Sequence, residues 1–110
     1  MKVLLLFYQD GKNREATKVV TFPEGLPPFK GMILHQENDE DFEVVDVELC
    51  LDKLEDKNNP AIILNLESRF TPKEEMGESA FLITFKNLAE EGWELNFDLG
   101  ELAQQTVVPA

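Results

Sequence analysis

Apolar and polar residues alternate along most of this chain, which is the pattern of half-buried β-strands. Residues 3–8 are apolar at consecutive positions, so residues 2–8 predict a central strand that is covered on both faces. Asp10-Gly11 then predicts a hairpin turn, because both residue types tolerate the positive φ of a type I′ turn. A second strand is predicted over residues 15–22.

Further strands are predicted over residues 32–36, 42–52, 61–67, 81–85 and 93–99. In the 42–52 segment, one face carries Val45, Val47, Leu49 and Leu51, and the other carries Asp46, Glu48, Cys50 and Asp52. In the 61–67 segment, Ile62, Leu64 and Leu66 are predicted to point inward. The 81–85 segment is read as a strand because Phe81, Ile83 and Phe85 alternate with other residues.

Proline, glycine and capping residues separate these segments. Residues 23–31 contain three prolines and two glycines, which interrupt a strand ladder. Residues 71–77 predict a single capped helical turn, with Thr71 as the cap, Pro72 at the first position and Gly77 at the end. Residues 87–92 predict a second short turn, and residues 100–110 fit either a helical turn or an edge strand.

These elements predict a mainly β fold: a small, partly open antiparallel barrel or sandwich of six to seven strands, with one or two single-turn helices. No helical period persists long enough to favour a βαβ fold. Residues 1–110 show no repeat and no linker, so we expect a single acidic β domain. The alternation is typical of small bacterial and phage barrels, but no particular family is recognisable from it.

Composition adds a strong negative charge to this picture. The 110 residues are 43% hydrophobic and include eight Phe, enough for a core, while 22 acidic residues against 10 basic ones give a net charge of -12. Nucleic-acid phosphates and anionic lipids would be repelled, so we expect neither direct nucleic-acid binding nor membrane binding. A basic protein partner would be attracted instead.

A cytoplasmic location is expected from two features of the sequence. The single cysteine cannot form an internal disulfide. The apolar run that opens the chain ends at Gln9 and Asp10, which is too short for most signal peptides and for a membrane span.

Residues 35–52 contain the only histidine, the only cysteine and eight carboxylates. An EF-hand loop would need a glycine where Val44 stands, so a calcium loop is not expected. A weak cation site formed by Glu37, Asp39 and Asp41 is an alternative to the favoured interpretation, a solvated acidic turn. No metal site is therefore predicted.

Few residues of this chain have the type and neighbours that catalysis requires. Cys50 shares a strand face with acidic neighbours, which opposes the low pKa that a catalytic thiol needs. His35 and Cys50 are too few for a structural zinc site, which takes four such ligands. No phosphate loop, dinucleotide motif or nucleophile elbow is present, so we predict no catalytic residue and no cofactor.

We therefore expect a non-enzymatic protein-interaction module, an accessory, adaptor or inhibitor protein, that acts through an acidic surface toward a basic or nucleic-acid-binding protein. A second possible patch contains Glu90, Glu91 and Glu94. One alternative is a β-edge self-assembly or structural subunit that forms a homo-oligomer. Another is a small carboxylate-dependent hydrolase or isomerase with its site in the barrel mouth. The predicted partner-binding residues are Glu37, Asp39, Glu40, Asp41, Glu43, Asp46 and Glu48.

Overall fold

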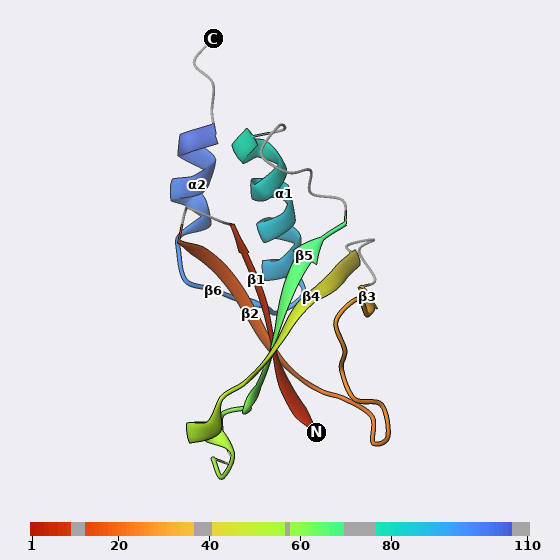
Figure 1. Ribbon diagram of the computed structural model, residues 1–110. Helices are drawn as coiled ribbons and strands as arrows, with labels where there is room; N and C mark the ends of the chain where they lie inside the picture. The colour runs from red at the N-terminus through yellow and green to blue at the C-terminus, as the bar shows by residue number, and fades with distance from the viewer. Residues whose placement is uncertain (10–12, 37–40, 57, 70–76, 107–110) are drawn as a thin grey trace.

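The computed structural model describes residues 1–9, 13–36, 41–56, 58–69 and 77–106. It is mainly β, which confirms the predicted fold class, and its elements are shown in Figure 1. The elements in chain order are β1 (Lys2–Gln9), β2 (Arg14–Thr21), β3 (Ile33–His35), β4 (Asp41–Leu49), the 3₁₀ turn η1 (Leu51–Lys53), β5 (Ile62–Ser68), α1 (Gly77–Glu90), β6 (Glu94–Leu95) and α2 (Leu99–Thr106).

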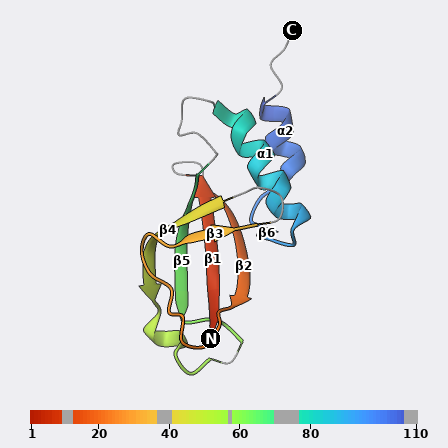
Figure 2. The same ribbon diagram turned by 90° about the vertical axis from the view of Figure 1, so that its right-hand side faces the viewer.

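Six strands form one sheet in the order β3-β4-β5-β1-β2-β6. The β1–β2 hairpin is present, with Gln9 opposite Arg14, and the predicted turn residues Asp10 and Gly11 lie outside the described residues. β1 is central, as predicted, but it pairs with β5 in parallel, so the sheet is mixed rather than purely antiparallel. Figure 2 shows β3 crossing in front of β1 and β2, so the sheet curls without closing into a barrel.

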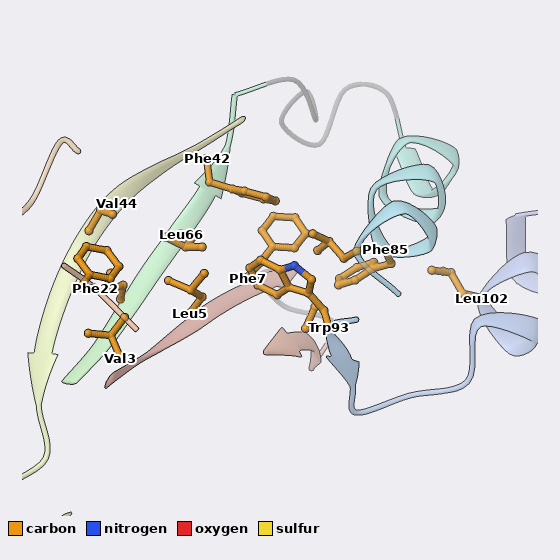
Figure 3. Packing of buried hydrophobic residues seen from close by; sticks show 13 residues of the cluster. Val3, Leu5, Phe7, Phe22, Phe42, Val44, Leu66, Phe85, Trp93 and Leu102 are labelled. Atoms are coloured by element: carbon orange, nitrogen blue, oxygen red, sulfur yellow. The ribbon is translucent and has the colours of Figure 1, made fainter. Parts of the chain in front are cut away.

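The core lies on the concave face of this curled sheet (Figure 3). Buried residues alternate along β1 and β5, and on β5 Leu64 and Leu66 are buried as predicted. Four aromatic contacts continue the core from β4 to the helices, with ring centroids 5.4 Å apart for Phe7 and Phe42 and 5.3 Å for Phe7 and Phe85. Such tilted pairs stabilise a core beyond the area that they bury.

The strand predicted over residues 81–85 is wrong, because these residues belong to helix α1. Phe85 and Leu88 are completely buried, whereas Ile83, which a strand would have placed inward with its neighbours, is 60% exposed. Phe81, Phe85 and Leu88 are spaced by four and three residues, which is the period of a helix face. The helix is therefore encoded in the same apolar residues that also fit a period of two.

Helix α1 ends in a Schellman motif at Gly92, whose φ is +89°. The Trp93 N–H donates to the Leu88 carbonyl at 3.0 Å, and the Gly92 N–H donates to the Ala89 carbonyl at 3.2 Å. The short turn predicted over residues 87–92 is thus the end of a longer helix. This motif brings Trp93 back into the core, where it is 5% exposed.

The C-terminal segment contains less strand than predicted. Only Glu94 and Leu95 of the predicted strand over residues 93–99 pair with β2. Asp98 then accepts a hydrogen bond from the Gly100 N–H at 2.7 Å and caps α2. The described part of the tail, up to Thr106, is therefore helical, which is one of the two structures that the sequence left open. The helical turn predicted over residues 71–77 falls almost entirely outside the described residues.

A β-bulge between Val44 and Asp46 changes the phase of alternation along β4. Before the bulge, Phe42 and Val44 point into the core and are 1% and 0% exposed. After it, Val47 and Leu49 lie opposite inward-facing residues of β5. The predicted placement of Val47 and Leu49 on one face and of Asp46 and Glu48 on the other is therefore right. The predicted strand over residues 42–52 is too long, because β4 ends at Leu49 and residues 51–53 form the turn η1.

Candidate functional site

Three of the predicted carboxylates form a row on the outer face of the sheet, opposite the core. Glu43, Asp46 and Glu48 are exposed, and the bulge is what keeps all three on this face, because a regular strand would turn Asp46 toward the core side once Phe42 and Val44 are inward.

Glu67 of β5 extends this row, because it lies directly opposite Glu43 in the antiparallel register. Like charges directly opposite each other destabilise a sheet. No ion pair among the described residues involves these carboxylates. We call the four residues the acidic strip: Glu43, Asp46, Glu48 and Glu67.

The remaining predicted residues of the acidic cluster are separated from the strip or lie outside the described residues. The Asp41 carboxylate is 2.7 Å from the His35 Nδ1, so this acid has a partner of its own. Glu37, Asp39 and Glu40 lie outside the described residues, and so does most of the alternative cation site.

The second acidic patch lies away from the first. Glu90 is at the end of α1 and Glu94 is on β6, and β6 is separated from β4 by three strands of the sheet. The Glu91 backbone carbonyl accepts a hydrogen bond from the Lys18 Nζ at 2.9 Å. The structure therefore does not combine the two patches into one surface.

The C-terminal half of β4 has an open backbone edge that sequence analysis missed. β3 pairs only with residues 41–43 of β4, and the loop before β3 reaches no further than Val44. The Cys50 N–H donates to the Ala61 carbonyl at 2.7 Å, toward β5. Because backbone groups alternate in direction along a strand, those of Val47 and Leu49 point away from β5, where no described residue pairs with them.

Apolar side chains accompany this open edge. Val47 is 40% exposed and Leu49 is 55% exposed, although both lie on the core side of the sheet. Leu51 and Leu54, in and after η1, are exposed as well. Figure 1 shows η1 at the lower left, apart from the β2–β3 loop at the lower right, so that loop does not cover this end of β4.

The outer face becomes apolar where it continues onto the central strands. Leu4 and Leu6 of β1 and Ile63 of β5 are half-buried, and Val19 of β2 is exposed. None of them belongs to the core cluster or packs against it. The sequence predicted a central strand that is covered on both faces, but among the described residues only one face of β1 carries the core.

A cavity of about 360 Å³ opens between β3 and the β1–β2 hairpin, where the curled sheet fails to close. Its polar lining residues are Lys18, His35 and Gln36, together with the indole of Trp93. The Trp93 Nε1 donates to the Gln36 Oε1 at 2.9 Å, and this bond joins the segment after β3 to the segment after α1. The inward position of Lys18, between Ala16 and Val20 in an alternating strand, is the sequence signal for this cavity.

His35 and Cys50 occupy opposite ends of β4. The His35 ring bonds to Asp41, the first residue of the strand, while Cys50 follows its last residue. At about 3.3 Å per residue the two ends are roughly 25–30 Å apart, so the two side chains cannot form a catalytic couple. Within the part of the chain that the structure describes, no three His, Cys, Asp or Glu side chains form a metal-binding group.

The polar connection after η1 contains Asp56, a carboxyl group whose pKa is lowered. Hydrogen bonds from the Asn59 side-chain amide, at 2.9 Å, and from the Asn58 backbone N–H, at 2.8 Å, lower the pKa of Asp56 below its ordinary value. The residue is fully exposed and its bonds are local, so it shapes a surface turn rather than a reactive site.

Comparison with protein-family models found no match, and comparisons with curated proteins and with solved structures found no significant similarity. Among the described residues, neither helix is long and apolar enough to cross a bilayer. The function proposed below therefore depends on the geometry of the chain itself.

Proposed function

We propose that this protein is a non-enzymatic interaction module that binds a basic protein segment along the C-terminal half of β4. The observation that carries the proposal is the coincidence of unpaired carboxylates with an unpaired backbone edge. Asp46 and Glu48 present charge on the outer face, while the intervening Val47 presents free backbone groups at the edge.

The chemistry of the segment follows from this alternation. An extended strand added to the open edge would form backbone hydrogen bonds with Val47 and Leu49. Its side chains would alternate between the two faces, so apolar residues would meet Val47 and Leu49 and basic residues would meet Asp46 and Glu48. The partner segment therefore alternates apolar residues with Lys or Arg.

The same edge bears on the self-assembly alternative. If two copies paired antiparallel about Val47, Asp46 of one copy would lie opposite Glu48 of the other. This like-charge contact opposes a homodimer through β4, and the other edge strands, β3 and β6, are only three and two residues long. We favour a basic partner over a second copy for this reason.

The alternative of a carboxylate-dependent enzyme requires an acid in a pocket. The residues that line the cavity between β3 and β2 include no Asp or Glu. We therefore extend the proposal to binding and not to catalysis.

A peptide titration tests the proposal. A fluorescently labelled peptide of alternating Val and Lys should bind the protein, measured by anisotropy, and its affinity should fall as salt is raised. An alternating Val and Glu peptide should not bind. Replacing the alternate Val residues by Pro should also abolish binding, because Pro lacks the N–H that pairs with the edge.

Two matched double variants locate the contact. The double variant Asp46→Lys with Glu48→Lys should lower the affinity for the Val–Lys peptide by at least 10-fold, which is equivalent to ~1.4 kcal/mol of binding free energy. Glu24→Lys with Glu101→Lys makes the same change in net charge at exposed positions away from β4 and should weaken it far less. Equal losses in both double variants would show that the peptide senses only net charge, and the proposed site would be wrong.

A further inference from the structure

A second candidate site, separate from the outer face of β4, is the cavity between β3 and the β1–β2 hairpin. Its volume of about 360 Å³ lies within the range of small-molecule sites, at the small end. Most of its lining is apolar and comes from five different segments of the chain. These apolar residues include Leu5, Val20, Phe22, Leu34, Phe42 and Leu66.

Lys18 gives the cavity a fixed positive charge. Its Nζ donates to the Glu91 backbone carbonyl at 2.9 Å, which holds the ammonium in place through one of its three donors. No described carboxylate lies within ion-pair distance of it, although the chain has 22 acidic residues. A lysine that points to the core side of a strand without an anionic partner can accept an anion from outside.

Gln36 adds an unused hydrogen-bond donor. Its Oε1 accepts the bond from the Trp93 indole, which fixes the orientation of the amide, so its Nε2 is the donor end. This Nε2 is buried and has no partner among the described residues. A buried donor without a partner destabilises a protein, so a ligand acceptor that bonds to this Nε2 would stabilise the complex.

We propose that this cavity binds a small carboxylic acid with an apolar body. The apolar body packs on the floor formed by Leu5, Val20 and Leu66, beside the Trp93 indole. The carboxylate accepts a hydrogen bond from the Lys18 ammonium, and a rotation of the Gln36 side chain brings its Nε2, which is closed to solvent in the unliganded protein, to the second carboxylate oxygen. A neutral apolar ligand would leave both donors unused, and a cation would be repelled by Lys18.

Trp93 makes the proposal directly measurable, because it is the only tryptophan and it lines the cavity. Titration with 3-phenylpropionate should change its fluorescence in a saturable way. The neutral analogue 3-phenylpropionamide should bind about 10-fold more weakly or worse, because it loses a charge-assisted hydrogen bond. If the fluorescence does not saturate with the acid, the proposal is overturned.

Variants separate the carboxylate contact from the apolar cavity. Lys18→Met should lower the affinity for 3-phenylpropionate by about 10-fold and leave the affinity for 3-phenylpropionamide nearly unchanged. Lys86→Met, at an exposed position on α1, should change neither affinity. Circular dichroism checks that Lys18→Met folds. An unchanged affinity for the acid in this variant would overturn the assigned contact.

A cavity-filling variant locates the ligand. Val20→Phe adds volume to the wall on β2 and should abolish binding of both compounds, while folding is again checked by circular dichroism. Binding that survives this change would place the ligand elsewhere and overturn the site. Since the cavity lining contains neither Asp46 nor Glu48, these results do not depend on those of the β4 peptide titration.

Discussion

The two halves of β4 carry similar apolar residues toward the same side of the sheet, yet their environments differ completely. In the first half, which pairs with β3, Phe42 and Val44 are buried in the hydrophobic core. In the second half, Val47 and Leu49 remain largely exposed, and their outer backbone edge has no partner among the described residues. The first half stabilises the fold, and the second half is the part that we propose binds a partner segment.

Truncation of an aromatic residue in the first half should have the largest effect on stability. Phe42→Ala removes two ring contacts, to Phe7 and Trp93, and leaves a cavity, so it should lower the free energy of unfolding by about 3–5 kcal/mol. Leu49→Ala, in the second half, should cost less than about 1 kcal/mol because the side chain is already exposed. Urea unfolding measures both, and similar losses would contradict the contrast.

The Trp93–Gln36 hydrogen bond should have the next largest effect. Trp93→Phe keeps a ring in the core but leaves the Gln36 Oε1 without its donor, so it should cost about 1–3 kcal/mol. The double variant with Gln36→Leu should recover part of this loss, because both polar partners are then removed. A loss that the second change does not reduce would show that ring size, and not the hydrogen bond, is responsible.

A charge reversal in the acidic strip should increase the stability of the protein, whereas the substitutions in the core decrease it. Glu67→Lys replaces the like-charge pair with Glu43 by an opposite-charge pair, so it should stabilise the protein by about 0.2–1 kcal/mol. The gain should shrink as salt is added. Glu24→Lys makes the same charge change on an exposed loop and is the control; an equal gain there would reflect net charge alone.

The smallest effect is expected on the exposed face of α1. Ile83→Lys should change the free energy of unfolding by no more than about 0.5 kcal/mol, because the side chain points to solvent in the helix. Leu88→Lys, on the buried face, should prevent stable folding. If Ile83→Lys were strongly destabilising, residues 81–85 would be packed as the strand that the alternation predicted.

How far the sequence predicts this structure depends on how distinct each pattern is. β1 and β5 were predictable because their apolar runs are long and bounded by turn residues. The helix from Phe81 to Leu88 was not predictable, because its apolar residues fit a period of two and a period of 3.6 equally well. The contacts of Phe85 with Phe7 and Phe97, which the sequence alone does not reveal, stabilise the helix.

The candidate sites were predictable only in part. The charge of Asp46 and Glu48 is evident from the sequence, but the open edge beside them follows from the short pairing between β3 and β4, a tertiary property. The bulge between Val44 and Asp46 could not be inferred from alternation alone. The cavity depends on how far the sheet curls. The only indication of it in the sequence is the position of Lys18 on the inward face of an alternating strand.

Amide hydrogen exchange at Val47 and Leu49, with and without the Val–Lys peptide, tests the central proposal most directly. In the free protein both amides should exchange rapidly, while the Cys50 amide, bonded to the Ala61 carbonyl, should be protected. The peptide should slow exchange at Val47 and Leu49 and leave Cys50 unchanged. Protection of both amides before the peptide is added, or rapid exchange at both while it is bound, would contradict the proposal.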